Sequence, residues 1–316
     1  MNSKTVLRPV NRKQCLISVC AIISATLLLT TSALGESPVS ASDKKASAAA
    51  QLRIVSLSPA ISRTLVDFGL HKQIVGRTPF CRALDPVTPI VGDLNGVAYE
   101  RLVRVRPTHV LVQPPTSGTD AKLAELAATH GWHLAQWPGL NTVQDIEQLI
   151  DQLPSVLFPE DSAQRLKATS RARELLTEIR MVLESQSAPI FNPRVLLLSG
   201  FEPVMAFGRE TYLHDIATRL GAVNAIDATG WVVLSLEDVV RINPQVVILV
   251  AGSESGIGRS PGAALETLSR LKIDAARRGR ITVLDHPDAM LPSSGVVGLA
   301  TAMRELLTVM ARGLSE

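Results

Sequence analysis

Histidine and cysteine are the side chains of this chain that could hold a transition metal. The six histidines include no pair at the HxH or HxxxH spacing that places two imidazoles on one strand or one helix face. His130 and His133 lie on either side of a predicted helix–strand junction, so we do not expect them to share an ion. His286 follows an apolar run and is the best single candidate for an axial ligand to a chelated metal, the alternative being a loop histidine satisfied by its own hydrogen bonds. Cys81 is interpreted as a small buried apolar residue, the alternative being a soft metal ligand.

Nucleophilic catalysis by a serine is the second kind of chemistry that the sequence could support. Residues 252–256 read Gly-Ser-Glu-Ser-Gly after an apolar run, the closest approach to a nucleophile elbow. An elbow requires a tight turn from a strand directly into a helix. The continuation to Pro261 is rich in glycine and would break such a helix. We therefore expect no catalytic residue and no enzyme.

Aromatic residues are scarce, at 3% of the chain, so each one near a loop carries weight. Trp137 precedes Pro138-Gly139, and Trp231 follows Gly230. Both are predicted to lie in loops, where an indole can stack on a planar macrocycle or an aromatic chelate. The alternative for each is packing of the loop onto its own domain.

Short apolar strands alternate with helical patterns through most of the chain. Runs at 53–57, 73–76, 109–112 and 133–135 are separated by segments with helical spacing, and a second series begins at 194–199. Strands without polar alternation, each followed by a helix, are typical of a mostly parallel sheet with helices on both faces. We therefore predict an α/β fold.

One long helical segment divides the two series. From Pro159 to about Ser187 the apolar positions keep helical spacing without another Gly or Pro. At about 1.5 Å per residue such a helix is roughly 40 Å long. We predict an N-terminal α/β lobe at 51–156, a linking helix at 157–188 and a C-terminal α/β lobe at 189–316.

An internal repeat supports two equivalent lobes. Residues 100–110 (ERLVRVRPTHV) align with residues 237–247 (EDVVRINPQVV), so that Glu100 matches Glu237 and Pro107 matches Pro244. The run at 194–199 repeats the run at 53–58 at nearly the same offset. Matching offsets at two places indicate one structural unit used twice.

In parallel α/β sheets ligands bind outside the carboxyl ends of the strands. A ligand cleft between two such lobes would be lined by the loops that follow the strands of both. The predicted cleft residues are Ser58, Pro59, Phe80, Cys81 and Trp137 from the first lobe, and Phe201, Tyr212, Trp231, Ser253, His286 and Met290 from the second.

The N-terminus is interpreted as a targeting segment. Residues 1–35 carry four basic residues, then an apolar stretch from Cys15 to Leu34, and a small-x-small site at Ala33-Leu34-Gly35. This order is typical of a secretory signal peptide. An uncleaved membrane anchor is the alternative. Residues 36–50 are rich in Ser, Ala and Lys and are predicted to be a flexible tether.

Charge and cysteine content argue against a nucleic-acid partner and against a disulfide framework. Four of the 32 basic residues and none of the 29 acidic residues lie in residues 1–35, which leaves 28 basic against 29 acidic. This balance gives no reason to expect a nucleic-acid partner. Two of the three cysteines also lie in the signal segment, so Cys81 has no partner for a disulfide within the remaining chain.

These motifs together resemble the iron-siderophore, haem and cobalamin periplasmic-binding family. Residues 53–60 resemble the first strand and turn of that family, and residues 68–76 resemble the glycine-containing step that follows in it. Further similarity covers residues 92–110, 221–244 and 275–283. Two departures concern the ligand. The Tyr-Pro common after the Phe80-Cys81 position is absent, and residues 292–295 (PSSG) lack the basic residue found there in the family.

The resemblance implies a class III periplasmic-binding architecture, with two mostly parallel lobes joined by one long backbone helix. It also implies the substrate-binding component of an ABC importer, periplasmic or otherwise exported, and membrane-tethered if residues 1–35 are retained. Such a protein is a monomer without a prosthetic group. It captures a metal chelate, such as a ferric siderophore, haem or cobalamin, and delivers it to a permease dimer with its ATPase.

The same resemblance assigns Glu100 and Glu237 to docking on the two permease subunits. The alternative is a pair of surface glutamates favoured by the dipole of the helix that each begins. The alternatives for the whole protein are an exported sensor or storage protein without a transporter, and a zinc- or manganese-binding protein.

Overall fold

The computed structural model describes residues 51–93, 96–114, 118, 120–184, 192–201, 203–252 and 261–312. The predicted signal peptide at 1–35, the tether at 36–50 and Ser253 lie outside the described residues. Residues Ala50–Glu316 form one unit, which comprises both lobes.

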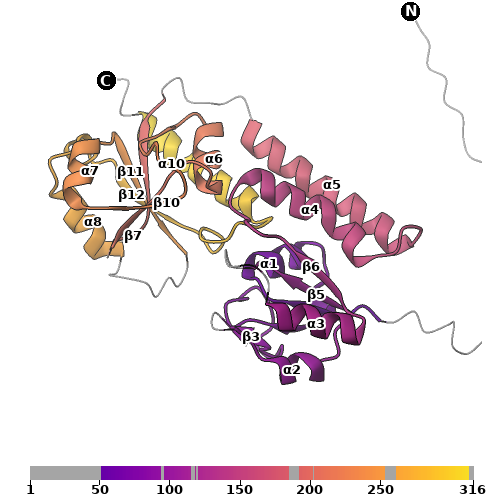
Figure 1. The fold of residues 1–316 in the computed structure, drawn as a ribbon. Helices are drawn as coiled ribbons and strands as arrows, with labels where there is room; N and C mark the ends of the chain where they lie inside the picture. Colours follow the sequence, from indigo (N-terminus) through magenta and orange to yellow (C-terminus); the bar gives the residue numbers. More distant parts are fainter. Residues whose placement is uncertain are drawn as a thin grey trace, which may run out of the picture. The chain divides into compact units, whose positions relative to one another are not determined.

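The N-terminal lobe is built on a four-stranded parallel sheet (Figure 1). Its strands are β1 (Ile54–Ser56), β2 (Ile74–Arg77), β5 (His109–Val112) and β6 (His133–Gln136), in the order β2-β1-β5-β6. The other elements are α1 (Pro59–Asp67), the 3-10 turn η1 (His71–Gln73), the hairpin β3 (Gly92–Asp93) and β4 (Gly96–Val97), α2 (Tyr99–Arg104) and α3 (Ala121–His130). All three strand pairs are parallel, as the apolar runs predicted.

The C-terminal lobe has a mixed sheet. Its strands are β7 (Arg194–Phe201), β8 (Val204–Phe207), β9 (Val223–Asn224), β10 (Trp231–Leu234), β11 (Val246–Ala251) and β12 (Ile281–Asp285). The order is β10-β8-β7-β11-β12, with β9 paired to β7. β7, β11 and β12 are parallel, whereas β8 is antiparallel to both β7 and β10. The helices of this lobe are α6 (Tyr212–Arg219), α7 (Leu236–Ile242), α8 (Pro261–Ser269), α9 (Asp274–Arg277) and α10 (Val296–Arg312).

The linking helix α5 spans Ala163–Glu184, inside the predicted 157–188 segment. It begins at Ala163 rather than at Pro159 because Ser162 caps it: the Ser162 Oγ accepts the backbone N–H of Arg165 at 3.1 Å. Residues 185–191 lie outside the described residues, so the far end of the helix is described only to Glu184.

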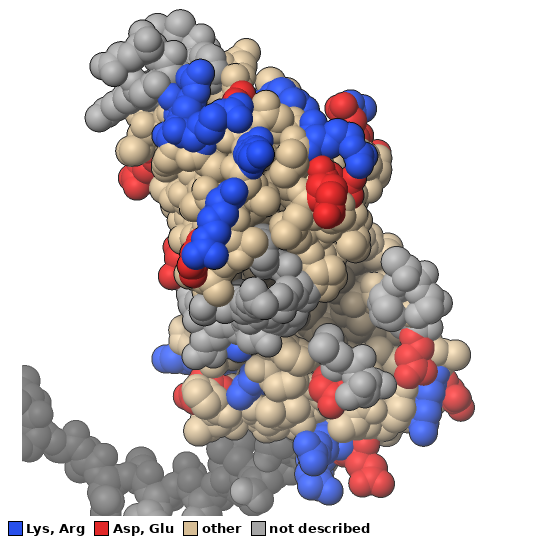
Figure 2. Space-filling view, turned by 90° about the vertical axis from the view of Figure 1, so that its left-hand side faces the viewer, with Lys and Arg blue, Asp and Glu red and all other residues tan. Residues whose placement is uncertain are grey.

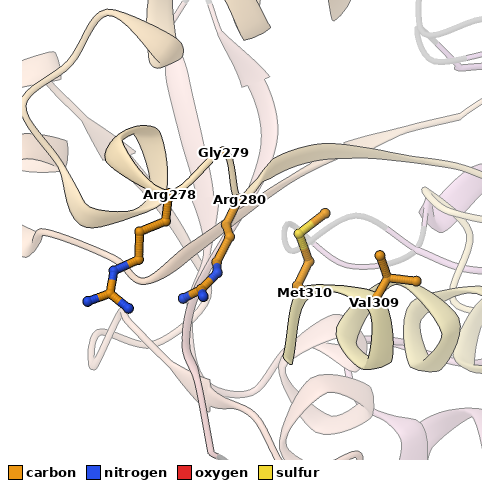
Figure 3. Close-up of a pocket in the computed structure, with 5 residues that line it drawn as sticks. All are labelled: Arg278, Gly279, Arg280, Val309 and Met310. Carbon is orange, nitrogen blue, oxygen red and sulfur yellow. The ribbon is translucent and has the colours of Figure 1, made fainter. Parts of the chain in front are cut away.

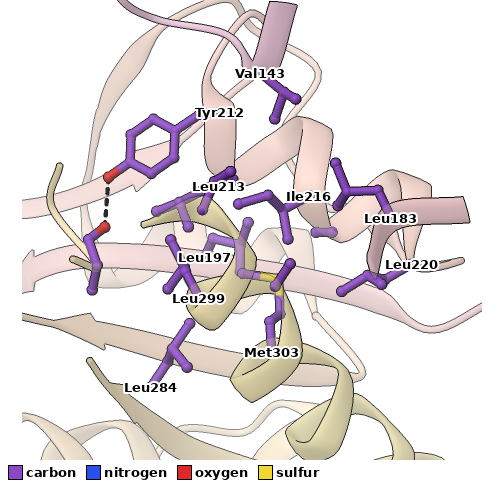
Figure 4. Packing of buried hydrophobic residues seen from close by; sticks show 14 of the residues in the cluster. Val143, Leu183, Leu197, Tyr212, Leu213, Ile216, Leu220, Leu284, Leu299 and Met303 are labelled. Atoms are coloured by element: carbon purple, nitrogen blue, oxygen red, sulfur yellow. Dashed lines mark hydrogen bonds between the residues drawn. The ribbon is translucent and has the colours of Figure 1, made fainter. Parts of the chain in front are cut away.

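A second helix, α4 (Val143–Leu157), packs along α5 and was not predicted. Its start is fixed by a capping box between Thr142 and Asp145. Val143 and Ile146 lie in the core of the C-terminal lobe, which Figure 4 shows around Tyr212 and Leu213. Leu149, Leu153 and Leu157, from the same helix, lie in the core of the N-terminal lobe. The two lobes therefore share α4 as a common part of their cores.

The internal repeat is visible in the backbone and in its hydrogen bonds. Arg106 and Asn243 both have a φ of +45° at the end of the repeated helix, directly before Pro107 and Pro244. Arg53 donates through its guanidinium to the carbonyl oxygens of Val105 and Arg106, at 2.8 and 3.0 Å. Arg194 donates in the same way to Ile242, at 3.0 Å. The two helix–proline–strand units thus have the same construction in both lobes.

The surface carries mixed charge. Figure 2 shows Lys and Arg side chains beside Asp and Glu side chains on the face it presents, with wide uncharged areas between them. Several ion pairs join neighbours on one helix, such as Arg171 with Glu174 on α5. Exposed pairs of this kind contribute little to stability, typically about 0–1 kcal/mol. Among the described residues, no helix combines the length and the apolar character needed to cross a bilayer.

Candidate ligand-binding site

A layer of small polar side chains lies at the carboxyl ends of β1 and β5. Ser58 caps α1, because its Oγ accepts the N–H of Ile61 at 3.4 Å, and its hydroxyl donates to Gln113 Oε1 at 2.9 Å. Ser62 donates to Ser56 Oγ at 2.9 Å, and the Ser56 hydroxyl donates to the Ser58 carbonyl oxygen at 3.1 Å. The predicted cleft residues Ser58 and Pro59 therefore lie at the expected edge, with Ser58 buried and Pro59 half-buried.

The loop after β2 joins this layer. Cys81 is buried, its Sγ lies 3.2 Å from Thr78 Oγ1, and it contacts the Ser56 carbonyl oxygen at 3.9 Å. The thiol is thus part of the lobe's core, in agreement with the apolar interpretation of this residue. Phe80, one residue earlier, is 43% exposed. Of these two predicted cleft residues, Phe80 has the accessible surface that a ligand needs.

Trp137 and Tyr212 pack into the cores rather than onto a cleft surface. Trp137 is 7% exposed, and its indole N–H donates to Gln152 Oε1, on α4, at 2.9 Å. Tyr212 is buried at the start of α6, and its hydroxyl donates to the carbonyl oxygen of Ala289 at 2.5 Å (Figure 4). Burial also raises the pKa of this hydroxyl. Here the structure corrects the sequence expectation, because both polar groups already have partners within the protein.

Trp231 lies away from the carboxyl edge of its sheet. β10 pairs Trp231 with Phe207 and Leu234 with Val204, and Val204 is paired with Phe201 at the carboxyl end of β7. Leu234 therefore reaches that edge, and Trp231 does not. The indole is 47% exposed and leans on the Phe207 ring with centroids 4.3 Å apart. The cleft placement fails because β8 and β10 form an antiparallel extension of the sheet that the sequence analysis did not anticipate.

His286 lines a pocket of about 360 Å³ between α1, α5 and the loop after β12. Its Nδ1 accepts the backbone N–H of Asp288 at 3.1 Å. Its Nε2 faces α10 so closely that a Cβ at Gly298 would lie 2.9 Å away. Nδ1 is thus occupied within the loop, and the axial-ligand role of His286 stays a prediction. Met290, on the same loop, is half-buried against the core of the C-terminal lobe.

The loop after β12 ties the two lobes together. Arg63 Nε donates to Asp288 Oδ1 at 3.2 Å, and Arg63 Nη1 lies 2.5 Å from Asp67 Oδ1. The Ser294 hydroxyl donates to Asp67 Oδ2 at 2.6 Å. Burial works to lower the pKa of Arg63, but the ion pairs with Asp67 and Asp288 outweigh it and raise that pKa. We call Arg63, Asp67, Asp288 and Ser294 the interlobe clamp.

Glu100 and Glu237 occupy the same position in the repeated unit. Each is the second residue of its helix, α2 or α7, and each is exposed. α7 begins with a capping box in which Ser235 and Asp238 bond each other's backbone N–H groups, and these hydrogen bonds lower the pKa of Asp238. α2 has Ala98 at its N-cap position, and no side chain caps it. The two carboxylates are therefore equivalent surface groups, one on each lobe.

A further pocket, of about 490 Å³, lies at the amino end of β12 (Figure 3). Arg278 and Arg280 flank the turn at Gly279, and their guanidinium groups lie side by side, with Val309 and Met310 of α10 across from them. Burial and the charge of Arg278 lower the pKa of Arg280. Because β12 begins at Ile281, this pocket lies at the opposite end of the strand from the cleft loops.

The described residues contain no group of three or more His, Cys, Asp or Glu side chains that could hold a metal ion.

The backbone of Phe201 ends β7 at the carboxyl edge, as predicted, but its side chain and all of Ser253 lie outside the described residues. Sequence reasoning missed Arg63 and Asp288, which are 225 residues apart in the chain, and no local motif signals such a pair.

The fold and this edge define a class: a binding protein with two α/β lobes, each presenting the loops at its strand ends. Residues 54–287 match the family model described as "Periplasmic binding protein". This chain belongs to the periplasmic binding protein family, and the resemblance drawn from its sequence motifs is confirmed.

Sequence identity to individual relatives is low. The chain is 21% identical over 205 residues to the uncharacterized ABC transporter substrate-binding lipoprotein YvrC of Bacillus subtilis, covering 63% of this chain and 64% of that protein. It is 27% identical over 209 residues to the vitamin B12-binding protein of Salmonella typhimurium, covering 65% and 74%.

Solved structures confirm the fold class. The apo form of the periplasmic heme-binding protein RhuT from Roseiflexus sp. RS-1 superposes with a TM-score of 0.65 at 20% identity, over 83% of this chain and 99% of that chain. The periplasmic heme-binding protein HutB of Vibrio cholerae gives a TM-score of 0.64 at 20% identity, over 82% and 99%.

Proposed function

We propose that this chain is the substrate-binding component of an ABC importer and captures a metal chelate between its lobes. The observation that carries this proposal is the shared construction of the lobes: in each, parallel strands end at a common edge, where the loops of a ligand cleft would lie. Membership of the periplasmic binding protein family supports the binding role. Relatives named for vitamin B12 and heme support a planar metal chelate as the ligand class.

Delivery to a permease is supported by Glu100 and Glu237. Both carboxylates are exposed at the start of equivalent helices, one on each lobe. A pair related by the lobe repeat is complementary to a two-fold permease dimer, and opposite charge on the permease would steer the encounter. In this function the chain needs no catalytic group, since ATP hydrolysis by the partner ATPase supplies the energy. Export through residues 1–35 would place the protein where such a permease opens.

The test is a direct binding titration of the protein without residues 1–35. Cobalamin, haemin and a ferric hydroxamate are titrated separately, with binding followed by calorimetry and by the ligand's own absorbance. We expect one of them to saturate at one equivalent with sub-micromolar affinity. Zn²⁺ and Mn²⁺ serve as controls for naked-metal binding. Binding of neither chelates nor metals would contradict chelate capture, and saturation by a bare metal alone would replace it.

A further inference from the structure

The loop after β2, residues 78–90, depends on a buried arginine. The loop contains Pro79, Pro86 and Pro89, which have no N–H group and so cannot donate a backbone hydrogen bond. Its carbonyl groups therefore outnumber its own backbone donors, and two of them accept donors from elsewhere. Arg77, the last residue of β2, is 7% exposed and supplies them. Its Nη1 donates to the Thr78 carbonyl oxygen at 3.1 Å, and its Nη2 donates to that of Pro86 at 2.9 Å.

The backbone of Arg77 closes the same loop. Its N–H donates to the carbonyl oxygen of Pro89 at 2.9 Å, and its own carbonyl oxygen accepts the N–H of Val91 at 2.9 Å. One residue thus holds the loop at both ends and, through its guanidinium, near the middle. A guanidinium suits this work because it presents several N–H donors in a fixed plane.

The position of this arginine has an energetic cost. Arg77 Nε is buried and has no hydrogen-bond partner among the described residues. Burying a cation whose contacts are carbonyl oxygens rather than a carboxylate is unfavourable. What the arrangement gains is a fixed loop conformation. In that conformation Thr78, Cys81 and Leu84 are buried, while Phe80 is the exposed aromatic between them.

We infer that Arg77 is a positioning residue for ligand binding: it holds the 78–90 loop so that the Phe80 ring is presented, already ordered, at the carboxyl edge of the N-terminal lobe. The inference rests on the proposed function, because the ligand class is taken from it. An apolar face fixed before binding favours a flat, partly apolar chelate, since the ordering cost of the loop has been met in the free protein.

The chain offers a matched control for the experiment. Arg53 also donates its guanidinium to two backbone carbonyl oxygens, those of Val105 and Arg106, but it precedes β1 and so lies at the amino edge of the sheet. Arg77→Lys and Arg53→Lys each replace a planar donor by a point charge. Both are expected to lower stability, and only Arg77→Lys is expected to change the cleft.

Two measurements are made on wild type, Arg77→Lys, Arg53→Lys and Phe80→Ala. The first is hydrogen exchange of the amides in 78–90. The second is the affinity for the chelate that the wild-type protein binds among cobalamin, haemin and ferric hydroxamate. For Arg77→Lys we expect loop exchange about tenfold faster and a Kd raised about tenfold. Arg53→Lys should leave both near wild type, and Phe80→Ala should raise the Kd without changing loop exchange.

The two proposals can fail separately. Loop exchange and affinity of Arg77→Lys equal to those of Arg53→Lys would overturn the role of Arg77. If Arg77→Lys fails to fold, Arg77→Gln takes its place, with Arg53→Gln as its control. If the wild-type protein binds none of the chelates, the proposed function fails. Loop exchange then decides only whether Arg77 holds the loop: faster exchange in Arg77→Lys supports that role, and unchanged exchange overturns it.

Discussion

His109 and His133 face each other on the neighbouring strands β5 and β6 of the N-terminal lobe. Their rings stack with centroids 5.1 Å apart, and Thr108 Oγ1 lies 2.9 Å from His109 Nδ1. Burial, and then the nearby charge of His133, lower the pKa of His109 to about 4. The folded protein therefore holds this imidazole neutral at a pH where the unfolded chain would protonate it.

The pH dependence of stability follows from this shift. Between an unfolded pKa of about 6.5 and the folded value, the unfolded chain binds more protons, so the free energy of unfolding falls as the pH is lowered through that range. We expect His109→Gln to flatten the fall, as measured by urea unfolding at a series of pH values. His71→Gln, which changes an exposed histidine, is the control. Equal slopes for wild type and His109→Gln would contradict the prediction.

At the same scale, the side chains show where sequence reasoning reached its limit. The carboxyl-edge positions of Ser58 and Phe80 follow from the strand before each of them. The burial of Trp137 depends on Gln152, and that of Tyr212 on Ala289, which is 77 residues away. No local pattern reports such distant partners. Loop tryptophans and tyrosines were therefore expected at the cleft when their polar groups were already bonded within the protein.

Among the elements, α4 was missed although its pattern is visible in the sequence. An amphipathic helix is recognised by one apolar stripe. The apolar residues of α4 form one such stripe, in which Val143, Ile146 and Ile150 enter one core while Leu149 and Leu153 enter the other. The strands of the N-terminal sheet were predicted correctly, since fully buried parallel strands are plain apolar runs. The antiparallel β8 and β10 were not anticipated, and the placement of Trp231 failed with them.

The shared helix predicts how the lobes unfold. Ile146→Ala and Leu153→Ala each remove a fully buried side chain, one from each core, and should each cost about 2–5 kcal/mol. Because α4 belongs to both cores, we expect the whole unit to unfold in a single cooperative transition. Each variant should lower the midpoint temperature of that transition, as measured by calorimetry. Gln148→Ala, on the exposed face of α4, is the control. A variant that shifts only part of the transition would show that the lobes unfold independently.

At the scale of the whole molecule, the interlobe clamp joins the lobes through side chains. Asp288 is buried and Arg63 is half-buried, and Asp67 and Ser294 complete their hydrogen bonds. Arg171 on α5 adds a donor to the Asp67 carbonyl oxygen at 3.0 Å. A close contact reinforces this arrangement, since a Cβ at Gly295 would lie 2.3 Å from Asp288 Oδ2. Together with α4 and α5, the clamp favours small movements between the lobes.

A double-mutant cycle measures the clamp. Arg63→Met and Asp288→Asn, alone and together, should give a coupling energy of about 1–2 kcal/mol in unfolding, because Asp288 is buried. The pair Arg209 and Asp227, with 57% and 89% of its side chains exposed, is the control and should couple by less than about 0.5 kcal/mol. Equal coupling in the two cycles would show that the clamp contributes no more than a surface ion pair.

The helix common to both cores has a practical consequence for reporter design. Binding proteins are often made into optical sensors by attaching a dye to each lobe and reading the change in distance when the lobes close. In this protein the cores of both lobes contain residues of the same helix, α4, so the distance between two such dyes should change little. A sensor should instead carry a single environment-sensitive dye beside Phe80, where an arriving ligand displaces water from the ring and alters the emission directly.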